Sequence, residues 1–119
     1  MSTTILLVDD EKDILAALKE LLEMEGYVVI TALNGKTGLY LFHEFKPDLI
    51  ISDMMMPIMN GYEMIAHIRL DPTLSKVPII VMSSAITLAR VEDAPWDYFI
   101  KKPYGIDDLL VIIKKLMEK

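Results

Sequence analysis

Residues 5–10 have the sequence Ile5-Leu6-Leu7-Val8-Asp9-Asp10, a short apolar run that ends in two carboxylates. The pattern recurs with Asp53 after Leu49-Ile50-Ile51-Ser52, Ser83 after Ile79-Ile80-Val81-Met82, and Lys102 after Tyr98-Phe99-Ile100-Lys101. Short apolar runs of this kind are typical of strands covered on both faces. In an open parallel sheet the carboxyl ends of the strands share one edge, where ligands bind. The pattern therefore predicts one polar site built from residues spread over most of the chain.

Helical patterns separate these runs. Residues 11–25 place apolar side chains at spacings of three and four among Lys and Glu, and Gly26 ends the pattern. The same spacing returns over 39–45, 64–68 and 109–116, whereas 85–93 is patterned weakly enough to predict only a short helix. Residues 27–30 add a further β-branched, apolar run. The chain is therefore expected to alternate strand and helix five times.

This alternation, with short connections, implies right-handed crossovers and helices on both faces of a parallel sheet. For five strands the common order is 2-1-3-4-5, and its switch point falls between strands 1 and 3. We therefore expect an α/β fold, a flavodoxin-like doubly wound five-stranded parallel sheet of the (βα)5 type. Asp9, Asp10 and Asp53 would then lie at the switch point.

Composition limits the possible functions. A chain of 119 residues with 53% hydrophobic and 25% charged residues fits one domain, expected over 1–119. No run approaches the ~20 apolar residues of a membrane helix. Cysteine is absent, and the net charge of −6 disfavours nucleic acid. With no basic, apolar leader in the sequence, we expect a cytoplasmic protein that contacts neither membrane nor nucleic acid directly.

The carboxylates at the predicted switch point call for a cation. A phosphate cradle after the first strand would need Gly, Ser or Thr with free amides, whereas the chain has Asp9-Asp10-Glu11. Two carboxylates about 4 Å apart repel by about 4 kcal/mol at an effective dielectric constant of about 20. With oxygen ligands alone, the natural cation is Mg²⁺.

Lys102 and Ser83 complete the predicted chemistry. Lys102 supplies a fixed positive charge, and Ser83 supplies a hydroxyl that can donate a hydrogen bond. A metal, an ammonium and a hydroxyl around a carboxylate suit phosphoryl transfer, where catalysis is mostly positioning and charge neutralisation. Asp53 is then the predicted nucleophile, and its product is an acyl phosphate.

Four motifs carry a family resemblance. Val8-Asp9-Asp10-Glu11, Asp53-Met54-Met55-Met56-Pro57-Ile58-Met59-Asn60-Gly61, Ser83-Ser84-Ala85 and Lys102-Pro103-Tyr104 resemble the signature of two-component response regulator receiver domains. The resemblance covers essentially the whole chain. It implies a phosphorelay protein whose Asp53 receives phosphate from a phosphohistidine on a histidine kinase or phosphotransfer protein. Lys102 and the Ser83 hydroxyl would hold phosphate oxygens.

The resemblance also implies a ligand set and a switch. Asp10 and Asp53 would bind Mg²⁺ through their side chains, Asp9 through water, and Met55 through its backbone carbonyl. Ser83 and Phe99 occupy the switch positions. The bond between Lys102 and Pro103 is similar to one that is cis in the family.

The chain departs from the family pattern in two places. The interval from Ser83 to Lys102 is about one helical turn short, which predicts a shortened helix 4, and Pro95-Trp96 replaces the usual Gly-Ala before the last strand. In the family, the face formed by helix 4, strand 5 and helix 5 commonly transmits the signal, and both changes fall in that region. The apolar residues Met55 and Ala85 flank the site, and we predict slow self-dephosphorylation from them.

Several residues also have purely structural interpretations. Asp10 could serve only as a helix N-cap, and Asn60-Gly61 is expected to start a helix. The methionines at 54, 55, 56 and 59 are interpreted as loop packing, since a hard cation does not use thioethers. His43 and His67 have no partner spacing and are not predicted as ligands, and Trp96 is expected to pack where the last strand begins.

We therefore expect a stand-alone receiver domain, a phosphorylation switch that acts through contact with an unidentified downstream protein. It would be no enzyme beyond its own phosphorylation and dephosphorylation. The alternative is a Mg²⁺-dependent phosphohydrolase with an aspartyl nucleophile. Such an enzyme usually has a second acid two residues after the nucleophile, where this chain has Met55. A pseudo-receiver that works without phosphate is disfavoured by the complete set of acids and the Lys.

Overall fold

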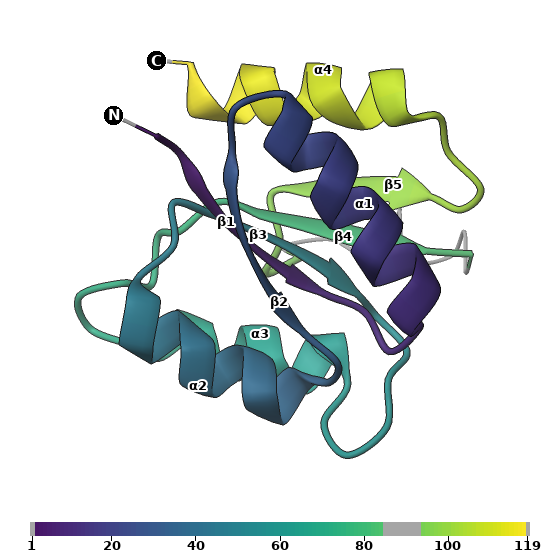
Figure 1. Ribbon diagram of the computed structural model, residues 1–119. Helices are drawn as coiled ribbons and strands as arrows, with labels where there is room; N and C mark the ends of the chain where they lie inside the picture. Colours follow the sequence, from purple (N-terminus) through teal and green to yellow (C-terminus); the bar gives the residue numbers. More distant parts are fainter. Residues whose placement is uncertain (1, 85–93, 119) are drawn as a thin grey trace.

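The computed structural model describes residues 2–84 and 94–118. Five parallel strands form one sheet in the order β2-β1-β3-β4-β5 (Figure 1). The strands are β1 (Thr4–Val8), β2 (Val28–Ala32), β3 (Leu49–Asp53), β4 (Ile79–Ser83) and β5 (Tyr98–Lys101). The predicted strand order is confirmed. Asp53 and Ser83, predicted at strand ends, are the last residues of β3 and β4.

Four helices are described: α1 (Lys12–Met24), α2 (Gly35–Phe45), α3 (Gly61–Arg69) and α4 (Ile106–Met117). α1 and α4 lie on one face of the sheet, and α2 and α3 lie on the other (Figure 1). α4 corresponds to the last helix predicted from the sequence, over 109–116. The predicted shortened helix over 85–93 lies outside the described residues. Within the part of the chain that the structure describes, no helix has the length and apolar character needed to cross a bilayer.

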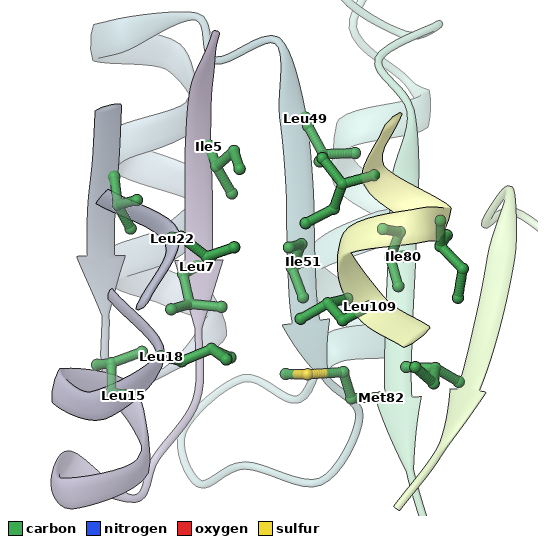
Figure 2. Close-up of a cluster of buried hydrophobic side chains, with 14 residues drawn as sticks. Ile5, Leu7, Leu15, Leu18, Leu22, Leu49, Ile51, Ile80, Met82 and Leu109 are labelled. Carbon is green, nitrogen blue, oxygen red and sulfur yellow. The ribbon is translucent and has the colours of Figure 1, made fainter. Parts of the chain in front are cut away.

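The core forms two layers because successive strand residues point to opposite faces of the sheet. Ile5 and Leu7 of β1 pack with the buried leucines of α1 and with Leu109 of α4, as Figure 2 shows. Leu6 and Val8, between them in sequence, belong to the opposite layer with the side chains of α2 and α3. Apolar surface is therefore buried on both faces of the central strands, which explains their unbroken hydrophobic sequences.

The start of α3 is tied to the end of β3. Asn60 accepts a hydrogen bond from the Glu63 amide at 2.8 Å, and the Glu63 carboxylate accepts one from the Asn60 amide at 3.2 Å. This is a capping box, so the prediction that Asn60-Gly61 starts a helix is confirmed. The Gly61 amide donates to the Met54 carbonyl at 2.9 Å, and a Cβ at Gly61 would collide with the Asp53 carbonyl oxygen. Only glycine lets α3 begin this close to Asp53.

Candidate functional site

The ends of β1 and β3 bring three carboxylates together. These strands are neighbours, with Val8 opposite Ser52, so Asp9 and Asp53 follow at the same level of the sheet. Carboxylate oxygens of Asp9, Asp10 and Asp53, one from each, all lie within 4.8 Å of one another. The predicted convergence of the three acids at the carboxyl edge is therefore confirmed.

Asp9 is held in place and is only 1% exposed. Its Oδ1 accepts a hydrogen bond from the Glu11 amide at 2.9 Å, whereas its Oδ2 is buried without a hydrogen-bond partner among the described residues. Burial raises the pKa of Asp9; the Glu11 amide and the charge of Lys102 oppose the rise, and the charges of Asp53 and Asp10 add to it. An unsatisfied buried oxygen costs about 1–3 kcal/mol. The site therefore has a buried acceptor available for a further ligand.

Asp10 is exposed and does not cap the first helix. The N-cap of α1 is Glu11, and no side-chain capping bond is found there among the described residues. The Glu11 amide is instead bound by Asp9. The interpretation of Asp10 as only a helix cap is therefore wrong, because the carboxylate that binds a backbone amide at the start of α1 belongs to Asp9.

Lys102 supplies the positive charge of the site. Its Nζ lies 3.0 Å from Asp53 Oδ2 and 3.8 Å from Asp9 Oδ2. Burial lowers the pKa of Lys102, but the hydrogen bond to Asp53 and the charges of Asp53, Asp9 and Glu11 outweigh it, so the pKa is raised. The ammonium form is thus strongly favoured. The backbone amide of Lys102 donates to the Ser83 carbonyl at 2.9 Å, which continues the β4–β5 pairing by one residue.

Ser83 and Tyr104 both lie at the carboxyl end of β4. Ser83 is buried at the end of β4, whose Met82 is paired with Asp53 in the sheet register. The Tyr104 hydroxyl donates to the Met82 sulfur at 3.0 Å. Burial, together with the charges of Asp9 and Asp53, raises the pKa of Tyr104 to about 12, so the phenol is neutral. No role was predicted for Tyr104 from the sequence; its place directly after Lys102-Pro103 was the available signal.

The methionines of the loop after Asp53 behave differently from one another. Met54 is buried, and Met56 and Met59 pack against the layer of α2 and α3, as predicted. Met55 is 70% exposed, so loop packing is wrong for this residue. Only its backbone carbonyl was predicted as a ligand, and an exposed side chain is compatible with that.

The remaining predicted residues lie as follows. Phe99 is half-buried and packs with the α2 and α3 layer. The Lys102–Pro103 bond is cis, as the family resemblance implied. His43 Nδ1 lies 3.4 Å from Asp71 Oδ2, and neither His43 nor His67 belongs to the acidic cluster.

The donor set fits a hard divalent cation. Asp9, Asp10 and Asp53 offer carboxylate oxygens, and Mg²⁺ is held by one or two carboxylates together with retained waters. The buried, unsatisfied Oδ2 of Asp9 could accept a hydrogen bond from such a water. With all three acids ionised and Lys102 protonated, negative charge remains in excess, which favours a cation at this edge.

Comparisons with known proteins agree with this geometry. The family model "Response regulator receiver domain" matches residues 5–114. The chain is 35% identical to the probable transcriptional regulator ycf29 of Pyropia yezoensis over 122 residues, which cover 100% of this chain and 55% of that protein. It is 33% identical to the transcriptional regulatory protein KdpE of Mycobacterium tuberculosis, with 98% and 52% covered. The chain thus spans about half the length of these relatives.

Solved structures show the same likeness. The response regulator TrrA of Thermotoga maritima, in complex with Mg²⁺–BeF, has a TM-score of 0.85 and 34% identity, with 97% of this chain and 99% of that chain covered. The chemotaxis response regulator CheY4 of Vibrio cholerae has a TM-score of 0.90 and 26% identity, with 98% and 100% covered. This chain belongs to the response regulator receiver domain family.

Proposed function

We propose that this receiver domain accepts a phosphoryl group on Asp53 and uses it as a switch for protein contacts. The observation that carries the proposal is the 3.0 Å contact between Lys102 Nζ and Asp53 Oδ2 inside the cluster of Asp9, Asp10 and Asp53. A lone lysine beside a lone aspartate would be an ordinary ion pair. A lysine beside one of three converging carboxylates provides groups that can bind a cation and a group that can bind an anion.

Each side chain has a role in this proposal. A carboxylate oxygen of Asp53 attacks the phosphorus atom, and the bond from phosphorus to the donor nitrogen breaks. Lys102 pairs with a phosphoryl oxygen, and the Ser83 hydroxyl donates a hydrogen bond to another. The side chains of Asp10 and Asp53, Asp9 through water and the Met55 carbonyl would hold Mg²⁺. When bound, Mg²⁺ neutralises negative charge on the transferring group.

The proposed phosphodonor is a phosphohistidine on a histidine kinase or phosphotransfer protein. Receiver domains of this kind pair with histidine kinases, and the chain is 34% identical over 119 residues to a region of histidine kinase P4 of Formosa agariphila. The complex of TrrA with Mg²⁺–BeF supports Mg²⁺ as the metal. We propose residues 1–119 as the receiver domain, with Ser83 and Phe99 as the switch and an unidentified protein as the output. A cytoplasmic location belongs to the same proposal.

Mass spectrometry after incubation with acetyl phosphate and Mg²⁺ tests the proposal. We expect one added phosphoryl group, located on Asp53, and none in Asp53→Asn or after the metal is chelated. Labelling of Asp53→Asn to the same extent as the original chain would contradict the assignment. The same samples test the alternative of a phosphohydrolase, since rapid multiple turnover of small phosphate esters would replace stoichiometric labelling.

Slow loss of the phosphoryl group stays a prediction. The exposed, apolar Met55 side chain offers no group that could orient an attacking water. Label retained after removal of acetyl phosphate, followed over time by mass spectrometry, measures the lifetime. A lifetime of only seconds would refute the prediction.

A further inference from the structure

β5, the strand that precedes Lys102, makes few stabilising contacts of its own. β5 has four residues, lies at the edge of the sheet and is paired with β4. Ile100 is its one buried side chain. A short edge strand with so little buried surface is expected to open more easily than the central strands. Contacts outside the strand must therefore help to set its position.

Arg69, the last residue of α3, makes these contacts. Its Nε donates to the Pro95 carbonyl at 2.7 Å, and its Nη2 donates to Asp97 Oδ2 at 3.0 Å. Its Nη1 donates to the carbonyls of Ser75 and Val77 at 2.6 and 2.8 Å. A guanidinium group suits this task because its donors form a rigid, planar fork. One side chain thus joins α3, the loop before β4 and the segment before β5.

Asp97 connects Arg69 to the sheet through hydrogen bonds. The oxygen bound by Arg69 also accepts a hydrogen bond from the Ile79 amide at 2.8 Å, and the Asp97 amide donates to the Ile79 carbonyl at 2.9 Å. Ile79 is the first residue of β4. The contact therefore sets how β5 begins against β4, at the end opposite Lys102.

Trp96 adds a third contact with α3. It is buried, as the sequence predicted, and packs edge to face with Tyr62 at a ring separation of 6.4 Å. The unusual Pro95-Trp96 pair is thereby placed against α3, whose first residue, Gly61, adjoins Asp53. One helix therefore contacts both the acceptor strand and the segment that precedes β5.

We propose that Arg69, acting through Asp97, is a positioning residue for Lys102. It holds the short edge strand β5 against β4 and so keeps the Lys102 ammonium beside Asp53. This inference rests on the proposed function, in which Lys102 pairs with the phosphoryl group. Weakening the contact would leave the site residues unchanged in sequence but withdraw Lys102 from Asp53.

The proposal predicts two affinity changes of opposite sign. The Lys102 ammonium repels a divalent cation and attracts an anion at the same carboxylates. If Lys102 moves away, Mg²⁺ alone should bind more tightly, and beryllofluoride in saturating Mg²⁺ should bind more weakly. A general loss of structure weakens both, so the opposite signs separate positioning from simple destabilisation.

The test compares Arg69→Gln and Asp97→Asn with the original chain by calorimetric titration of Mg²⁺, and of beryllofluoride with Mg²⁺ present. Lys102→Gln is the reference for complete loss of the ammonium. Lys19→Gln, which removes one charge from an exposed ion pair, and Ile68→Val, a core change on α3, are the controls. Asp97→Asn keeps an oxygen for the Ile79 amide and serves if Arg69→Gln does not fold.

We expect both test variants to shift both affinities in the direction of Lys102→Gln, by about fivefold or more, while the controls stay near the original values. Unchanged affinities in Arg69→Gln and Asp97→Asn, or a fall of both affinities together, would overturn the proposal while Asp53 labelling still supports the proposed function. Absence of opposite shifts in Lys102→Gln would overturn both the proposal and the role given to Lys102. If acetyl phosphate does not label Asp53 in the original chain, the result counts against the proposed function itself.

Discussion

Lys102 Nζ lies 3.0 Å from Asp53 Oδ2 and 3.8 Å from Asp9 Oδ2, so one ammonium group serves two buried carboxylates from different strands. Asp9 follows β1, Asp53 ends β3 and Lys102 follows β5. The contact therefore depends on how three strands are placed. It also links charge at the site to the stability of the fold.

Lys102→Gln should lower the free energy of unfolding by about 1–3 kcal/mol in metal-free buffer, because Asp53 loses a charged hydrogen-bond partner. Since the folded-state pKa of Lys102 is raised above the ordinary 10.5, this stabilisation is complete below pH 10.5. It is lost as the pH rises through the folded-state pKa. Urea unfolding at neutral and alkaline pH measures both effects. Lys19→Gln is the control and should cost no more than about 0.5 kcal/mol.

Asp9→Asn should stabilise the metal-free protein at pH 7. The folded-state pKa of Asp9 is raised by burial, so its ionisation above the ordinary value of 3.8 opposes folding. As the pH rises through the folded-state pKa, the original chain should lose stability that the variant keeps, since an amide oxygen can still accept from Glu11. Mg²⁺ should reverse the order by stabilising the original chain more than the variant. Urea unfolding with and without Mg²⁺ checks this, and a less stable metal-free variant would contradict it.

Asn60→Ala should cost about 1 kcal/mol of stability, because the capping box at the start of α3 is lost. It should also weaken Mg²⁺ binding, since the loop after Asp53 ends at this cap. Asn34→Ala is the matched control: Asn34 caps α2 by accepting from the Thr37 amide at 2.9 Å. Thermal unfolding should show similar losses, with Mg²⁺ affinity reduced in Asn60→Ala alone. Equal Mg²⁺ affinities in the two variants would show that the Asn60 cap does not affect Mg²⁺ binding.

Gly61→Ala should destabilise the fold by about 2 kcal/mol, because the added methyl group meets the backbone of Asp53 and Met54. Its effect on Mg²⁺ affinity should exceed that of Gly105→Ala, where the new methyl group makes only an ordinary contact with Asp108 at 3.6 Å. Calorimetric Mg²⁺ titration compares the two. Original-chain affinity in Gly61→Ala would show that the site tolerates a displaced α3.

Tyr104→Phe should remove the tyrosine with the raised pKa of about 12. In an alkaline absorbance titration of the five tyrosines, the variant should lack a late step that the original chain shows. Because the folded-state pKa is above the ordinary value of 10.0, the hydroxyl contributes stability below pH 10 that is lost as the pH rises towards 12. At pH 7 the loss of the bond to Met82 should cost about 1 kcal/mol. Loss of absorbance change near pH 10, with the late step unchanged, would show that Tyr104 is solvated.

The sheet order and the meeting of Asp9, Asp10, Asp53 and Lys102 could be predicted from sequence because they follow from local patterns and one topological rule. Apolar runs define the strands, helical spacing defines the crossovers, and parallel strands present their carboxyl ends at one edge. The packing of Met55 could not be predicted in this way. Its neighbours in sequence are equally apolar, and only the path of the loop exposes it.

By itself, then, the sequence determined the strands and the acids that end them, because each is encoded within a few consecutive residues, and the topological rule for parallel sheets then determined the strand order. Tertiary structure alone decided that Asp9 rather than Asp10 is buried and bound to the Glu11 amide. It also decided that Tyr104 reaches Met82 and that Arg69 reaches Asp97. These last two contacts join residues far apart in the chain, and they form only once packed helices and strands have fixed where each side chain can point.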